Sequence, residues 1–220
     1  MRKTLLLGAI AMALALPTAS QAQFSLGARI GYAPAMGAAE KDPATGESFK
    51  MKDGIKSQIP LQLDAAYKVT PEIAVGAYFS YGFGQVGSAV KAECDAFGQD
   101  CSASDMRLGL QAFYTFTKVS PQFTPWAGLG LGYEWGKIKA TGGGFADESA
   151  TFSGWEFLNL QFGADYKVSD QFGIGPYVMF SIAQYGSVEA ESGGASASAD
   201  VEKKAIHEWL GFGVRGKFDL

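Results

Sequence analysis

Apolar and small or polar residues alternate along most of this chain. Between Ile73 and Phe83, one set of alternate residues is mostly bulky and apolar, whereas the other is mostly small. The stretches 104–117 and 204–220 show a similar segregation. A period of two residues is typical of β-strands, in which neighbouring side chains point to opposite faces. The sequence therefore predicts strands with one bulky apolar face and one face of small or polar residues.

A short polar phrase recurs three times and marks a turn each time. The copies begin at Tyr67, Phe116 and Tyr166, which are 49 and 50 residues apart, and each lies between two alternating runs. This spacing indicates that one repeat is one long β-hairpin. We expect eight strands joined alternately by three short turns and four long loops. The expected strands are 24–34, 57–68, 72–86, 104–117, 122–139, 152–167, 171–188 and 204–220, with long loops at 35–56, 87–103, 140–151 and 189–203.

The two faces of the expected strands suit a membrane better than water. Bulky apolar side chains would meet hydrocarbon, and aromatic residues near the turns would form a belt at the membrane interface. Small residues interleaved with charges would fill a narrow interior. A soluble barrel would need a well-solvated exterior, which faces rich in glycine, alanine and serine provide poorly. The sequence predicts an all-β fold, an eight-stranded antiparallel up-and-down transmembrane β-barrel.

Residues 1–22 have the features of an export signal. Two basic residues precede an apolar run from Leu5 to Leu16, and a small-residue cleavage motif follows. The run of 12 residues is shorter than the roughly 20 that a membrane-spanning helix needs, which favours a cleaved signal peptide. We expect residues 23–220 to form one barrel domain. Cleavage would remove two cations and change the formal charge from −4 to −6, so the charge gives no reason to expect nucleic acid as a partner.

The last strand reads Gly-Phe-Gly-Val-Arg-Gly-Lys-Phe-Asp-Leu over residues 211–220. With the signal peptide, the eight strands and the short turns opposite long loops, the chain resembles the small bacterial outer-membrane barrels of the OmpX, Opa and OmpA transmembrane-domain type. The closing strand is similar to the assembly signal read by the barrel-assembly machinery, with Phe218 and Leu220 as its bulky residues. That signal usually ends in phenylalanine, whereas this chain ends in leucine. We expect no counterpart of the peptidoglycan-binding domain of full-length OmpA.

The resemblance implies a place and an orientation. It implies a porin-like monomer in the outer membrane of a Gram-negative-type envelope, in contact with lipid and lipopolysaccharide. In such barrels short turns face the periplasm and long loops face outward. Lys68, Lys118 and Lys167 would then mark the periplasmic turns. Ten acidic residues lie in or directly beside the second to fourth loops, Asp105 among them. We interpret these as a solvated surface, the alternative being a rim for divalent cations or a basic partner.

Cys94 and Cys101 are the only cysteines of the chain. An exported protein folds in an oxidising compartment, and a metal site would need more ligands than these two residues supply. The sequence therefore predicts a disulfide within the second long loop.

Charges of both signs fall on the small-residue face. Because buried charges must pair or stay hydrated, we interpret this set as a salt-bridge and hydrogen-bond network that plugs the lumen. An eight-stranded barrel has an interior that side chains just fill. The alternative is a narrow porin-like channel or an OmpW-like carrier for small solutes. We expect Arg107 and Arg215 to organise the plug with acids drawn from Asp64, Glu134 and Asp165. The residues expected in the lumen are Arg29, Gln62, Asp64, Arg107, Gln111, Glu134, Asn159, Gln161, Asp165, Arg215 and Lys217.

The sequence offers no catalytic site. His207 is the only histidine, and a lipid-modifying barrel hydrolase would need a serine nucleophile beside it. The strand neighbour two residues on is Trp209, so we expect no enzyme and place His207 at the membrane interface or the rim. We expect no metal and no cofactor. The predicted role is structural or surface-interactive, with an extracellular loop ligand that the sequence does not name.

Overall fold

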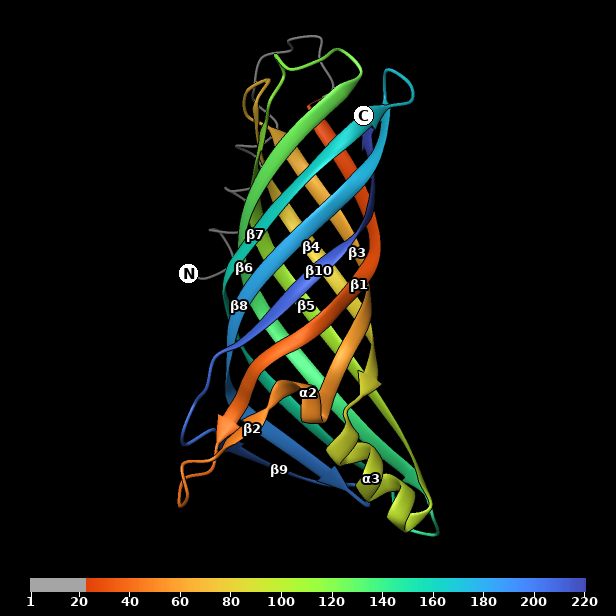
Figure 1. Cartoon of the computed structure of the whole chain (residues 1–220), viewed down its shortest axis with the longest axis vertical. Coiled ribbons are helices and arrows are strands. Elements are labelled where there is room, and N and C mark those ends of the chain that lie inside the picture. The colour runs from red at the N-terminus through yellow and green to blue at the C-terminus, as the bar shows by residue number, and fades with distance from the viewer. Residues whose placement is uncertain (1–22) are drawn as a thin grey trace, which may run out of the picture.

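The computed structural model describes residues 23–220, so the predicted signal peptide at 1–22 lies outside the described residues. Eight long tilted strands form a closed barrel (Figure 1). All pairings are antiparallel, and β10 closes the ring by pairing with both β1 and β8. The predicted eight-stranded antiparallel barrel is confirmed. The barrel strands are β1 (Phe24–Lys41), β3 (Ile55–Lys68), β4 (Ile73–Val86), β5 (Gln99–Thr115), β6 (Phe123–Gly142), β7 (Glu148–Lys167), β8 (Phe172–Ser192) and β10 (His207–Asp219).

The barrel wall has the two faces that the alternation predicts. On β4, Phe79 is 42% exposed whereas its neighbour Tyr78 is 2% exposed. Leu63 on β3 and Leu110 on β5 are each 63% exposed, and large apolar side chains cover the outer wall on every barrel strand. An apolar surface of this extent would associate in water, whereas in a bilayer it meets hydrocarbon. The closed ring leaves no unpaired strand edge toward lipid.

The three short turns and the C-terminus lie together at one end of the barrel (Figure 1). Lys68, Lys118 and Lys167 all lie at this end, in or beside the turns. Lys68 Nζ lies 3.1 Å from Asp219 Oδ1, and Lys167 Nζ lies 2.9 Å from Asp170 Oδ1. The hydrogen bond and charge of Lys167 lower the pKa of Asp170. That this end faces the periplasm stays a prediction.

The closing strand completes the ring through its whole length. Phe218 pairs with Leu26 on β1 and with Phe172 on β8, and its side chain is 40% exposed on the outer wall. The backbone N–H of Leu220 donates to the Phe24 carbonyl over 2.8 Å. The last residues are therefore part of the wall, and their role as an assembly signal stays a prediction.

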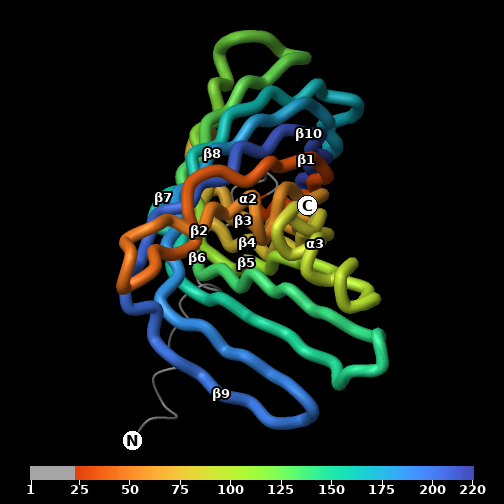
Figure 2. The backbone as a smooth tube through the Cα atoms, turned by 60° about the horizontal axis from the view of Figure 1, so that its bottom comes forward, coloured from red at the N-terminus to blue at the C-terminus, as the bar shows by residue number. Residues whose placement is uncertain are grey.

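At the other end, the strands run further than the sequence analysis expects. β1 continues to Lys41, β6 to Gly142 and β8 to Ser192, so much of the predicted loops 35–56, 140–151 and 189–203 is strand. β9 (Ala195–Asp200) pairs with β8 and β2 (Ser48–Lys50) pairs with β1. Figure 2 shows the extensions of β6, β7, β8 and β9 leaning out beyond the barrel as a separate wall. The predicted bounds were wrong because alanine, serine and charged residues carry these extensions and weaken the apolar alternation.

Two helices also lie in the predicted long loops. α2 (Met51–Gly54) turns inward over the barrel, with Met51 buried, and α3 (Ser88–Phe97) lies against the start of β5. α3 ends at Gly98, whose φ of 62° is a left-handed conformation that glycine adopts without strain. Neither helix of residues 23–220 has the length and hydropathy that a membrane-crossing helix requires.

Candidate functional site

A polar cluster fills the lumen toward the long-loop end, with Arg107 at its centre. β5 and β6 place Arg107 and Glu134 directly opposite each other in the ladder. The Nε of Arg107 donates to Asp105 Oδ1 over 2.8 Å and lies 3.9 Å from Glu134 Oε2. Its Nη1 donates to Glu156 Oε1 over 3.4 Å. All four side chains are at most 4% exposed, so three buried carboxyl groups share one guanidinium.

Three side chains from the last two barrel strands also hold Glu134. Its Oε1 accepts hydrogen bonds from Trp209 Nε1 at 3.0 Å and from the Tyr185 hydroxyl at 3.1 Å. His207 Nε2 lies 3.3 Å from the same oxygen, and the imidazole stacks on the Tyr185 ring with centroids 4.2 Å apart. Trp209 and His207 belong to β10. The closing strand therefore completes a cluster that β5 and β6 begin.

A second polar cluster crosses the lumen toward the short-turn end. Arg29 Nε donates to Asp64 Oδ2 and its Nη1 donates to Gln161 Oε1, each over 2.7 Å. The other oxygen of Asp64 accepts from Gln62 Nε2 at 2.7 Å and from Gln111 Nε2 at 2.8 Å. These residues come from β1, β3, β5 and β7. The cluster therefore ties opposite walls of the barrel together.

Arg215 lies beside this second cluster and packs against aromatic rings. Its guanidinium carbon is 4.3 Å from the Trp126 ring centroid and 4.9 Å from the Phe113 ring centroid. Such stacking stabilises a guanidinium that has few water contacts. Asp165 Oδ2 lies 3.8 Å from Arg215 Nη1, and Asp165 Oδ1 accepts from Trp126 Nε1 over 3.2 Å.

Glycines on the inner face make room for large side chains that cross the lumen. Tyr78 reaches from β4 to Glu156 on β7, to which its hydroxyl donates. A Cβ atom at Gly109 would lie 2.5 Å from the Tyr78 ring, and one at Gly132 would lie 2.5 Å from the Tyr78 hydroxyl. Only glycine permits this approach. These inner glycines are therefore covered by side chains rather than lining an open path.

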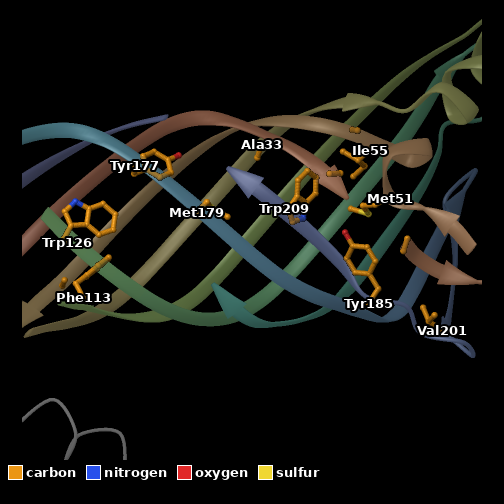
Figure 3. Close-up of a cluster of buried hydrophobic side chains, with 14 residues drawn as sticks. Ala33, Met51, Ile55, Phe113, Trp126, Tyr177, Met179, Tyr185, Val201 and Trp209 are labelled. Carbon is orange, nitrogen blue, oxygen red and sulfur yellow. The ribbon is translucent and has the colours of Figure 1, made fainter. Parts of the chain in front are cut away.

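Apolar side chains close the lumen at the long-loop end. Met51 from α2, Ile55 from β3 and Val201 are each at most 4% exposed, and they belong to one buried cluster with Tyr185. Figure 3 shows this group near the long-loop end, whereas Trp126 of the same cluster lies toward the opposite end. We call Met51, Ile55, Tyr185 and Val201 the apolar cap.

The structure brings most of the predicted lumen residues into the barrel interior. Of the acids expected around Arg107 and Arg215, Glu134 lies beside Arg107, Asp165 lies beside Arg215, and Asp64 pairs with Arg29 instead. Lys217 and Asp165 are only half-buried. The buried members of the predicted set are Arg29, Gln62, Asp64, Arg107, Gln111, Glu134, Asn159, Gln161 and Arg215.

Two residues were wrongly expected outside the lumen, and one lumen carboxyl was missed. Asp105 is 1% exposed rather than part of an acidic rim, and His207 is fully buried rather than interfacial. Both lie two residues from a buried residue of the same strand, Asp105 from Arg107 on β5 and His207 from Trp209 on β10, so the alternation itself places them on the inner face. Glu156, also fully buried, was missed because a β-bulge beside it reverses the alternation along β7. The only sequence signal was a charged residue within an apolar run.

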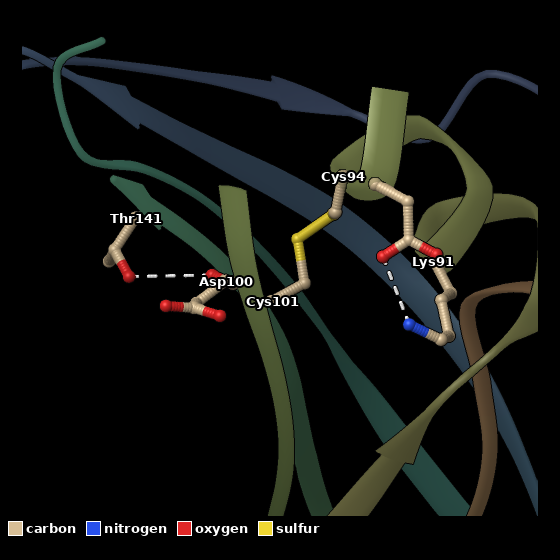
Figure 4. Close-up of a disulfide and its surroundings, with 6 residues drawn as sticks. Lys91, Cys94, Asp100, Cys101 and Thr141 are labelled. Carbon is tan, nitrogen blue, oxygen red and sulfur yellow. Dashed lines mark hydrogen bonds and ion pairs between the residues drawn. A yellow bond between two sulfur atoms is a disulfide. The ribbon is translucent and has the colours of Figure 1, made fainter. Parts of the chain in front are cut away.

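The predicted disulfide between Cys94 and Cys101 is present in the structure (Figure 4). It ties the last turn of α3 to the start of β5. Cys94 is 5% exposed. Next to Cys101, the Asp100 carbonyl accepts a hydrogen bond from Thr141 Oγ1 over 3.3 Å. The disulfide therefore holds α3, which lies beyond the barrel, to β5.

The sequence pattern of a protein family described as outer membrane protein beta-barrel domain matches residues 4–199. The chain belongs to this family. Among solved structures, this outer-membrane barrel is similar to a major outer membrane protein of Thermus thermophilus, with 11% identity, a TM-score of 0.57, and 89% of this chain and 99% of that chain covered. OprG from Pseudomonas aeruginosa is 17% identical, with a TM-score of 0.51 over 91% and 98% of the two chains. AlkL is 16% identical, with a TM-score of 0.50 over 93% and 95%.

These structural similarities support the fold, and membership of the family supports the cellular location. No curated protein matches the sequence. The chain is a small outer-membrane β-barrel protein, and its location is the cell outer membrane. Lipid contact follows from the apolar outer wall.

Proposed function

We propose that this outer-membrane barrel is a non-enzymatic monomer with a plugged lumen, whose role is structural or surface-interactive and is carried by the long-loop end facing outward. One observation supports it most directly. Two buried polar clusters and the apolar cap fill the lumen with paired side chains. Because these ion pairs lie inside the lumen, opening a water path would require several of them to separate.

Single-channel recording of refolded protein in planar bilayers tests this proposal. We expect no stable, frequent conductance. Arg107→Ala removes a central filler of the lumen, so it is the variant in which a leak would first appear. A steady conductance of the unmodified protein that Arg107→Ala leaves unchanged would contradict the plug. That result would favour the alternative of a narrow channel or carrier for small solutes.

We also propose that the outer wall contacts phosphate groups of lipopolysaccharide. Four lysines, together with the outward-facing Met36 and Ile206, line a cavity of about 840 Å³ beside β1 and β10. Within residues 23–220, none of these lysines has a carboxylate oxygen within 4 Å. An unpaired cationic patch next to a lipid-facing surface complements anionic headgroups. The four lysines are Lys41, Lys50, Lys52 and Lys204.

Native mass spectrometry of the barrel released from nanodiscs tests the lysine patch. Replacing all four lysines with glutamine should reduce retention of bisphosphorylated lipid A, and dephosphorylated lipid A should be retained equally poorly by both proteins. Lys137→Gln/Lys139→Gln is the control, because those lysines already pair with Glu191 and Asp147. Equal retention by the quadruple variant and the unmodified protein would contradict this contact.

A further inference from the structure

A second cavity, of about 950 Å³, opens at the long-loop end beyond the apolar cap. The extensions of β6 to β9 form one wall, and α3 and β2 lie across from them (Figure 2). Ile138 and Phe152 line this cavity and also pack against the buried cluster that includes the cap. The cavity therefore borders the buried cluster that includes the apolar cap. We call this space the mouth cavity.

The mouth cavity is lined largely by apolar side chains. Phe97 and Phe145 are 54% and 59% exposed, and their ring centroids lie 5.9 Å apart at its edge. On β6 the alternation continues, with Ile138 and Ala140 lining the cavity and Lys137 and Lys139 outside its lining. On the other extensions, serine and glutamate residues line the cavity beside the alanines. Exposed aromatic rings around a concave space mark a binding surface rather than a solvated loop. The alanines that line it are Ala140, Ala150, Ala190, Ala195 and Ala197.

The charges around the mouth cavity have one sign. Four glutamates line it, and no lysine or arginine does. Glu191 is paired with Lys137 at 3.4 Å. The other three, Glu40, Glu93 and Glu148, have no lysine or arginine nitrogen within 4 Å in residues 23–220. An occupant that complements this lining therefore has an apolar body and carries positive charge.

The disulfide belongs to the same site. Cys94 and Cys101 both line the mouth cavity, and their bond fixes the last turn of α3. Glu93 and Phe97 lie on that turn, one residue before and three residues after Cys94. The covalent link therefore holds one carboxylate and one aromatic ring of the cavity in place. Helix α3, the disulfide and the β8–β9 hairpin therefore all contribute to one cavity.

We propose that the mouth cavity binds a small amphipathic cation, an amine with an aromatic or alkyl body. The body would pack on the phenylalanine rings and the alanine wall, and the ammonium group would lie among the unpaired carboxylates, where aromatic faces also attract cations. The volume is at the upper end of the range for small-molecule sites, roughly 300–1,000 Å³. This inference rests on the proposed surface-interaction role and names its ligand class.

The test uses the full mature barrel in phosphatidylcholine nanodiscs, with empty nanodiscs as the blank. Tryptamine is the cationic probe, and indole-3-propionate is the anionic probe with the same ring. Isothermal titration should show tryptamine binding at least about tenfold more tightly than indole-3-propionate, a difference of about 1.4 kcal/mol. Equal affinity for the two probes, or no binding of tryptamine, would overturn the inference.

Variants separate the cavity from the general surface charge. Glu93→Gln/Glu148→Gln should weaken tryptamine binding about tenfold, whereas Glu189→Gln, on the same wall but outside the cavity lining, should leave it unchanged. Ala150→Trp fills the cavity and should abolish binding while the heat-dependent migration of the barrel on gels stays normal. Binding that survives Ala150→Trp would refute the site. A conducting lumen with normal tryptamine binding would overturn the plug alone, and a closed lumen without binding would overturn this inference alone.

Discussion

Arg107 is the residue on which the polar cluster toward the long-loop end of the lumen depends. Three carboxyl groups from β5, β6 and β7 converge on it, and its guanidinium carbon also lies 5.2 Å from the Trp209 ring centroid. Lysine could supply the charge but not the planar set of donors that reaches several acceptors at once. The arginine is therefore the group that lets these acids be buried together.

Arg107→Ala is expected to lower the free energy of unfolding by about 3–5 kcal/mol, because it leaves buried carboxyl groups without their partner. The measurement is urea unfolding of protein refolded into lipid vesicles. Lys167→Ala is the matched control, since its ion pair with Asp170 is exposed and such pairs contribute little. If the two variants were equally stable, the buried network would not be what stabilises the barrel.

The alternation of side chains along a strand tells which residues face the lumen and which face lipid only while the strand is regular. On β5 and β6 the alternation is unbroken, and it places both Arg107 and Glu134 inside, where the structure has them. On β7 one extra residue lies between Glu156 and Leu158, so Trp155 and Phe157 face outward at 57% and 56% exposure. A bulge depends on the pairing with both neighbouring strands, which a single strand's sequence does not contain.

At the scale of elements, the extensions beyond the barrel differ from the barrel strands in what they bury. The barrel strands carry a bulky apolar face toward lipid, and this alternation is easy to recognise in the sequence. The extensions do not face lipid, so alanine and serine alternate with charges there, and their sequence resembles that of a loop. α3 was missed for a related reason. Its ten residues include few strong apolar positions, and its place depends on a covalent bond to β5.

Replacing Cys94 and Cys101 with serine should leave the barrel intact and release α3. Closing a ring of this size is worth roughly 2.5 kcal/mol in the chain-entropy estimate, which is enough to order a short helix. Limited proteolysis of refolded protein should show faster cleavage between residues 87 and 103, while the heat-dependent gel migration of the barrel stays unchanged. Unchanged cleavage would mean that packing alone holds α3, and free thiols in the non-reduced protein would contradict the disulfide itself.

At the scale of the whole molecule, closure of the ring explains resistance to detergent. Every barrel strand has two hydrogen-bonded neighbours, so no edge offers a starting point for unfolding. We expect unboiled and boiled samples to migrate differently on SDS gels, with β-rich circular dichroism before heating. Identical migration, together with solubility in the absence of detergent, would contradict a closed membrane barrel.

The ends of the barrel give a test of its orientation. A tag inserted near Gly46, in the turn after β1, or near Ala195, at the β8–β9 hairpin, should be reached by antibody on intact cells. A tag in the turn at 118–122 should be reached only after the outer membrane is permeabilised. The reverse labelling pattern would show that the long loops face the periplasm.

The cluster around Glu134 has a kinetic consequence. Its members come from β3 to β8 and from β10, which is the last strand in the chain. A sheet without β10 lacks the hydrogen bond from Trp209 to Glu134 and the contact of His207 with the same oxygen, so it would leave this carboxyl group incompletely bonded. Intermediates of this kind are costly, which makes insertion close to an all-or-none event. Because the decisive contacts join residues far apart in sequence, we expect insertion to be slow as well. The pairing of β10 with β1 and β8 is then its last step.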